Sequence, residues 1–171
     1  IKSPTGSGKG SLITMLSAKF NIKTVIYVIG IELLHQMKDN FSRLYPNLKV
    51  GIVGDGHCDV QDITITTIWS AAAAFNHKAQ LIDSDTTNDS EKKNKNLNKE
   101  LVRKMVNQAE MIIIDECQYA AAETIQFLHK ASVSARHRFL FSGTPWRDTG
   151  DDILIEAVGG PKIYDLGATK L

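Results

Sequence analysis

The sequence lacks the features that mark secreted, membrane-spanning and fibrous proteins. Its two cysteines, Cys58 and Cys117, are too few for a disulfide framework. No apolar run approaches the roughly 20 residues that a membrane-spanning helix needs, and the first residues do not resemble a signal peptide. We therefore expect an intracellular protein of the cytoplasm, or of the host cytoplasm if it is viral, with no membrane partner.

An excess of charge of one sign is also missing. The 171 residues include 20 Lys and Arg against 19 Asp and Glu, which gives a formal net charge of +1. This balance argues against a strongly basic coat for nucleic acid, although a local basic face stays open. With 43% hydrophobic and 23% charged residues, the composition is that of a globular domain. The length fits one domain or one lobe of a larger protein.

Apolar periodicity predicts alternating strands and helices. Runs of β-branched and apolar residues predict strands at about 24–29, 49–53, 63–67, 111–114 and 139–141. Helical spacing of apolar residues predicts helices at about 8–20, 33–44, 70–75, 101–106 and 124–128. Residues 83–98 are almost devoid of apolar groups and predict a polar, mobile loop. The alternation predicts an α/β domain with a mainly parallel sheet flanked by helices.

A glycine-rich loop, Ser3-Pro4-Thr5-Gly6-Ser7-Gly8-Lys9, opens the sequence and leads into a predicted helix. Backbone N–H groups in such a turn cradle nucleotide phosphates, and the lysine reaches the β- and γ-phosphates. The alternative is a flexible turn that only caps the helix. The candidate nucleotide-binding residues are Thr5, Gly6, Ser7, Gly8, Lys9, Gly10 and Ser11.

This loop departs from the usual phosphate-binding pattern at two positions. Ser3 stands at the position of the first glycine, and Gly10 follows the lysine where a Ser or Thr hydroxyl usually ligates Mg²⁺. Either Ser11 takes over as a metal ligand or water fills that coordination position. A loop of this kind normally follows a buried strand, of which only Ile1 and Lys2 are present. We therefore expect a piece of a longer protein or an incomplete amino end.

Two carboxylates follow the predicted strand at 111–114. Asp115 and Glu116 stand at its carboxyl end, where an open α/β sheet presents its ligand site. In nucleotidases with a phosphate loop, an Asp at this place holds Mg²⁺, and a neighbouring Glu can orient or deprotonate the attacking water. The alternative is that both acids cap the next helix. The predicted cofactors are thus ATP and Mg²⁺, with Asp115 as the metal ligand.

The order of these motifs resembles the first motor lobe of superfamily 2 helicases, the DEAD/DEAH-like group. The glycine-rich loop resembles motif I, Asp115-Glu116-Cys117-Gln118 resembles motif II, and Ser142-Gly143-Thr144-Pro145 resembles motif III. Segments 28–36 and 66–70 resemble motifs Ia and Ib. The resemblance covers residues 1–171 and implies a RecA-like lobe of a P-loop NTPase that lacks most of the strand before the loop. It also implies an ATP-dependent helicase or translocase.

The resemblance assigns roles to individual residues. Catalytic roles fall to Asp115, Glu116 and Gln118, although Gln118 stands where many members have His. Ser142, Gly143 and Thr144 would couple the nucleotide state to movement, and Gly30, Thr67, Trp69 and Ser70 would contact nucleic acid. For Trp69 and Trp146, core packing is the competing interpretation. The ending 142–147 favours DNA over RNA. The resemblance also implies a second RecA-like lobe of the same protein, absent from this sequence, that supplies an arginine finger.

Two other functions stay open on the sequence. Glycine after the lysine also resembles the loop of nucleoside monophosphate kinases, which predicts a phosphotransferase, but the arginine-rich lid of those enzymes is missing. A nucleotide-binding module that has lost hydrolysis through Gly10 is the second alternative. The cluster His57-Cys58-Asp59 lacks the paired spacing that a zinc site requires.

Overall fold

The computed structural model describes residues 1–4, 6–77, 89–116, 123–143 and 152–165, and their side chains except those of 89–93 and 152–155. Its centre is a six-stranded sheet with the order β3-β2-β4-β1-β5-β6. The strands are β1 (Thr24–Val28), β2 (Val50–Gly54), β3 (His57–Asp59), β4 (Ile63–Thr67), β5 (Met111–Asp115) and β6 (His137–Phe141). Neighbouring strands are parallel except β2 and β3, which are antiparallel. The predicted mainly parallel sheet is confirmed.

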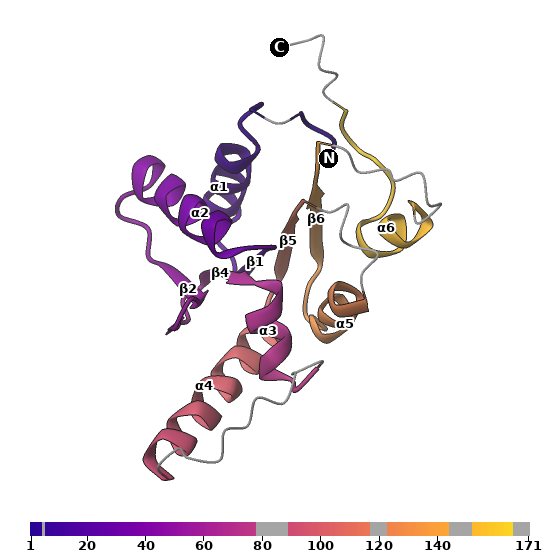
Figure 1. Cartoon of the computed structure of the whole chain (residues 1–171). Helices are drawn as coiled ribbons and strands as arrows, with labels where there is room; N and C mark the ends of the chain where they lie inside the picture. The colour runs from indigo at the N-terminus through magenta and orange to yellow at the C-terminus, as the bar shows by residue number, and fades with distance from the viewer. Residues whose placement is uncertain (5, 78–88, 117–122, 144–151, 166–171) are drawn as a thin grey trace.

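Helices lie on both faces of this sheet (Figure 1). They are α1 (Lys9–Phe20), α2 (Ile31–Leu44), α3 (Ile68–Ala74), α4 (Asp89–Gln108), α5 (Glu123–Ala131) and α6 (Asp152–Gly159). Helices α1 and α2 pack together on one face, and α3 packs against α4 and α5 on the other. Among the helices of the described ranges, none combines the length and the apolar character that a membrane crossing requires.

The two faces of the sheet bury separate hydrophobic clusters. Ile112 and Ile114 belong to the cluster beneath α3, α4 and α5, whereas Met111 and Ile113 belong to the cluster beneath α1 and α2. Successive strand residues point to opposite faces. A strand covered by helices on both sides is therefore apolar throughout. This explains the continuous apolar run before Asp115.

Helix α4 corrects the predicted loop at 83–98. Residues 89–98 are helical, and 83–88 lie outside the described residues. Val102 and Val106 are buried in the core, and the Arg103 Nε donates a hydrogen bond of 2.6 Å to the Ala74 carbonyl at the end of α3. Because the packed carboxyl half supplies the costly helix nucleus, the polar residues before it extend the helix at little further cost.

Candidate functional site

The first residues of the chain pair with the carboxyl end of β6. The Ser3 amide donates to the Ser142 carbonyl at 2.8 Å, and the Ser142 amide donates to the Ile1 carbonyl at 3.1 Å. Ser142 is fully buried, and Gly143 follows it directly. The start of the glycine-rich loop is therefore held beside the segment that resembles motif III. Thr144 of that segment lies outside the described residues.

The glycine-rich loop turns through left-handed backbone at two glycines. Gly6 has a φ of 81° and Gly8 a φ of 83°, values that L side chains rarely adopt. A Cβ atom at either position would meet nothing within 4 Å, so the loop borders open space. Gly8 is the N-cap of α1 and has no side-chain hydrogen bond to the helix. The structure thus forms an open cradle at a helix amino terminus, which suits a phosphate group.

Serine hydroxyls stabilise this loop from within. The Ser7 Oγ donates to the Pro4 carbonyl at 2.6 Å and lies 2.5 Å from the Ser3 Oγ. The hydroxyl of Ser7 is thus engaged in the loop's own turn, and the role of Ser7 in nucleotide binding stays a prediction. Thr5, another predicted nucleotide ligand, lies outside the described residues.

Lys9, Asp115 and Glu116 meet at the carboxyl edge of β5. The Lys9 Nζ donates to the Ser3 carbonyl at 3.3 Å and lies 3.7 Å from the Glu116 Oε1. Asp115 ends β5 with 6% of its surface exposed, and its Oδ1 accepts a hydrogen bond of 3.0 Å from the Glu116 amide. Glu116 adopts a φ of 57°, an uncommon conformation for a non-glycine residue that often marks functional sites.

Burial raises the pKa of Asp115 above the ordinary value of an aspartate, and the neighbouring Glu116 carboxylate raises it further. The hydrogen bond from the Glu116 amide and the positive charge of Lys9 lower it in part. A divalent cation at this place would relieve the repulsion between the two carboxylates. Gln118, the third predicted catalytic residue, lies outside the described residues, as does Cys117.

These groups line a cavity of about 350 Å³ between the loop, α2 and β5. Its lining residues are Gly6, Gly8, Lys9, Gly10, Ser11, Leu33, Gln36, Met37, Asn40, Asp115 and Glu116. Magnesium is typically held by one or two carboxylates together with substrate phosphates and water. This cavity fits a nucleoside triphosphate with Mg²⁺, because it combines an open glycine cradle, a lysine and two carboxylates. Within the described ranges, no three His, Cys, Asp or Glu side chains gather as a metal site built from protein ligands alone would need.

Residues from α2 were missed by the sequence analysis. Gln36 and Asn40 line the cavity although they stand about 30 residues beyond the loop. A signal was present, because Asn40 follows Leu33 and Met37 at helical spacing. A polar residue at an inward helical position invites a functional explanation.

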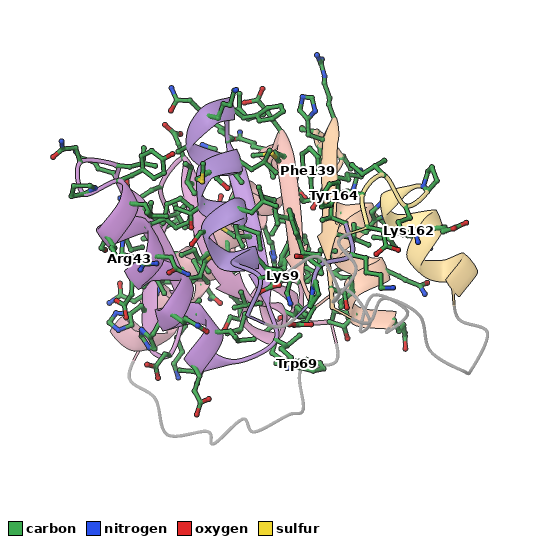
Figure 2. All side chains as sticks on the ribbon, turned by 90° about the horizontal axis from the view of Figure 1, so that it is seen from above. Lys9, Arg43, Trp69, Phe139, Lys162 and Tyr164 are labelled. Carbon is green, nitrogen blue, oxygen red and sulfur yellow. The ribbon has the colours of Figure 1, made fainter. Side chains whose placement is uncertain are left out.

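A second cavity of about 690 Å³ lies at the carboxyl ends of β1 and β4. It is lined by Ile29, Gly30, Ile31, Glu32, Leu33, Asp55, Thr67, Trp69 and Ser70. All four residues predicted to contact nucleic acid are therefore brought together here. Trp69 is 62% exposed, so the competing interpretation that it packs in the core is wrong. Figure 2 shows Lys9 near the middle of the molecule and Trp69 at its edge.

Thr67 and Ser70 are also bonded to each other. The Thr67 Oγ1 accepts a hydrogen bond from the Ser70 amide at 3.1 Å and donates to the Ser70 Oγ at 2.8 Å, so Thr67 caps α3. Gly30 caps α2 with an extended φ of −153°. A proline ring fixes φ near −65°, so proline would not fit this backbone at position 30. Leu33 lines both cavities, and the first turn of α2 stands between them.

Comparisons with known proteins find both a family model and a curated relative for this chain. A family model described as "Type III restriction enzyme, res subunit" matches residues 1–147. The DNA 3'-5' translocase XPB2 of Sulfurisphaera tokodaii is 26% identical over 168 residues, which cover 98% of this chain and 32% of that relative. This chain thus spans about a third of the curated relative's length.

Solved structures share the fold at low sequence identity. A hypothetical ATP-dependent RNA helicase from Sulfolobus tokodaii has a TM-score of 0.63 and 17% identity, over 91% of this chain and 43% of that one. The UvsW helicase of bacteriophage T4 has a TM-score of 0.62 and 18% identity, over 92% of this chain and 50% of that one. The predicted RecA-like helicase lobe is confirmed as the fold.

Proposed function

This chain belongs to the family of the type III restriction enzyme res subunit, and we propose from that premise that it is the first lobe of an ATP-dependent helicase or translocase that moves on nucleic acid. The observation that carries the proposal is the meeting of Lys9, Asp115 and Glu116 in one cavity with the open glycine cradle. The relatives and solved structures are helicases and translocases, which disfavours the phosphotransferase alternative.

In this proposal the chain's residues divide the work on ATP. Gly6, Gly8 and Lys9 bind the phosphates, because a left-handed turn exposes backbone N–H groups and the lysine neutralises charge. Asp115 holds Mg²⁺, which neutralises charge on the phosphates when bound. Glu116 orients the attacking water and takes up its proton. In the described structure Lys9 lies against Glu116, and bound phosphates would draw the lysine away and free the carboxylate for water.

Nucleic acid would bind at the second cavity. Exposed Trp69 offers a ring on which a base can stack, and the first turns of α2 and α3 present amide groups to backbone phosphates. We propose DNA as the nucleic acid because the curated relative is a DNA translocase. A second RecA-like lobe would close the nucleotide cavity and supply the arginine finger, since this chain spans about a third of that relative.

The test is ATP hydrolysis by the full-length protein, measured with and without single- and double-stranded DNA and RNA. We expect DNA to stimulate hydrolysis more than RNA does. Lys9→Ala should abolish nucleotide binding. Glu116→Gln should keep nucleotide binding and lower the hydrolysis rate roughly 10²- to 10⁴-fold, the usual contribution of a general base.

Lys19→Ala is the matched control, because Lys19 is an exposed lysine in the last turn of the same helix. It should behave as wild type. Nucleotide binding without turnover, with or without DNA, would instead support a binding module that has lost hydrolysis. Phosphate transfer from ATP to a nucleoside monophosphate would support the kinase alternative.

A further inference from the structure

We propose that Asn40 of α2 takes the place of the hydroxyl that the phosphate loop lacks and binds a phosphate oxygen of the nucleotide through its side-chain amide. This inference rests on the proposed function, because it assigns one more ligand to the same nucleotide cavity. It begins from Gly10, the residue after Lys9, where the usual phosphate-loop pattern carries a Ser or Thr hydroxyl.

The space beside Gly10 is already taken. A Cβ atom at Gly10 would lie 2.6 Å from the Asn40 Nδ2, far closer than ordinary van der Waals contact. The backbone of Gly10 is itself held in place, because the Thr14 Oγ1 donates to its carbonyl at 2.8 Å. The amide of Asn40 therefore lies where the side chain of residue 10 would otherwise be. Glycine at this position and asparagine at position 40 fit each other.

Arg43 determines which end of the Asn40 amide faces the loop. The Arg43 Nη2 donates a hydrogen bond of 3.0 Å to the Asn40 Oδ1. The Nδ2 group, with its two N–H donors, is left to face Gly10 and the cavity that Lys9, Asp115 and Glu116 also line. Both partners come from α2 and are one helical turn apart, so the helix presents the amide in this orientation.

A nitrogen donor and a hydroxyl differ in what they can bind. A hydroxyl oxygen ligates Mg²⁺ through a lone pair, whereas an amide N–H₂ group has no lone pair for a cation and donates to anionic oxygen. Hydrogen bonds to phosphate oxygen are charge-assisted and stronger than neutral ones. With the Asn40 amide in place of a hydroxyl, this part of the site binds the phosphates and not the metal ion. The contribution of Asn40 to nucleotide affinity should therefore depend little on whether Mg²⁺ is present.

The experiment measures equilibrium binding of a fluorescent ADP analogue to the full chain, in Mg²⁺ and in EDTA. Asn40→Ala should weaken binding roughly tenfold to a hundredfold in both conditions, the range for a hydrogen bond to a charged group. Asn40→Asp keeps the shape and the acceptor for Arg43 but loses both donors and adds a negative charge. It should therefore weaken binding at least as much in EDTA and recover in part with Mg²⁺. Asn47→Ala, an exposed asparagine after α2, is the matched control and should bind as wild type.

A position swap provides the second arm. Gly10→Thr alone should weaken binding, because its Cβ displaces the Asn40 amide. Gly10→Thr combined with Asn40→Ala makes room for the hydroxyl, so binding should return in Mg²⁺ and stay weak in EDTA. Circular dichroism melting confirms that each variant is folded, and the near-isosteric Asn40→Asp carries the test if Asn40→Ala is unfolded.

Wild-type affinity for Asn40→Ala in both conditions would overturn the inference, as would a loss confined to Mg²⁺. Lys9→Ala keeps the two proposals apart. If Lys9→Ala abolishes binding while Asn40→Ala and Asn40→Asp bind as wild type, only the role of Asn40 fails. If the wild-type chain does not bind nucleotide at all, the proposed function fails with it.

Discussion

Two adjacent carboxylates at the end of β5, Asp115 and Glu116, destabilise the folded chain electrostatically. Asp115 is almost fully buried, and Glu116 follows it in left-handed backbone. Burial and the Glu116 charge raise the pKa of Asp115, and a backbone hydrogen bond and Lys9 act against them. Proteins commonly place such unfavourable charge where a ligand will neutralise it. The cost at Asp115 is consistent with a cation site.

Asp115→Asn should therefore raise the free energy of unfolding at pH 7. Between the ordinary pKa of an aspartate and the raised pKa of Asp115, the folded state holds a proton that the unfolded chain has released. The stability of the wild type thus falls as pH rises through that interval and stays lower above it. The Asn side chain carries no charge at any pH. Urea unfolding at several pH values should give a difference that is largest at pH 7 and shrinks toward pH 4.

Asp39→Asn is the control for this prediction, since Asp39 is an exposed carboxylate on α2 and its replacement should change stability little. A less stable Asp115→Asn at pH 7, or a stability difference that does not vary with pH, would contradict the electrostatic explanation.

At the residue scale, the sequence predicts the candidate site residues that belong to a motif. It does not predict the cavity-lining residues that come from another helix. Lys9, Asp115 and Glu116 could be identified because their chemistry is tied to fixed spacing after strands and glycines. Asn40 could not, because its approach to Gly10 depends on how α2 packs against α1. The hydrogen bond of the Ser7 hydroxyl within the loop's own turn could not be predicted either, because it depends on the backbone conformation of the loop.

At the scale of elements, the antiparallel pair β2–β3 depends on one glycine. A Cβ atom at Gly51 would lie 2.3 Å from the Asp59 carbonyl oxygen and 2.8 Å from the Gln61 amide nitrogen. Both atoms belong to the backbone, so neither can rotate away. Gly51→Ala should therefore shift the pairing and cost roughly 1–3 kcal/mol, the usual range for overpacking. In thermal unfolding this corresponds to a melting temperature lower by several degrees.

Gly30→Ala is the contrasting variant. A Cβ atom there would meet nothing within 4 Å, and its extended φ of −153° suits any residue that is not proline. Because alanine is a poorer N-cap than glycine, this variant should lose at most about 1 kcal/mol of stability, without the overpacking expected at Gly51. Equal losses for the two variants would show that the close approach at Gly51 does not decide the outcome.

Apolar runs and apolar periodicity predicted the helices and strands that are buried against the core. They did not predict elements that are polar or only a few residues long. Strand β1 and helix α2 were predicted because each buries a face that the sequence pattern reveals. The amino half of α4 gave no such pattern, and its helix depends on the packed half that follows. Strand β3 was missed because three residues paired on one side only are too few to give an alternation.

At the scale of the whole molecule, the two cavities lie on either side of one structural element. The nucleotide cavity and the cavity at Trp69 both include Leu33 in the first turn of α2. A displacement of this turn by a bound nucleotide would reach the second cavity directly. Linkage then requires that nucleic acid change nucleotide affinity by the same factor as nucleotide changes nucleic-acid affinity.

Trp69→Ala tests whether the two cavities bind different ligands. Base stacking on an aromatic side chain contributes about 1–3 kcal/mol per base, so the dissociation constant for a single-stranded oligonucleotide should rise roughly 5- to 150-fold. Fluorescence anisotropy of a labelled oligonucleotide measures this change, and Trp69→Phe should retain most of the affinity.

Nucleotide affinity without nucleic acid should stay unchanged, because Trp69 does not line the nucleotide cavity. The melting temperature should also stay unchanged, because 62% of Trp69 is exposed. A lower melting temperature with unaltered oligonucleotide binding would instead assign Trp69 to the fold and leave the second cavity without a stacking residue.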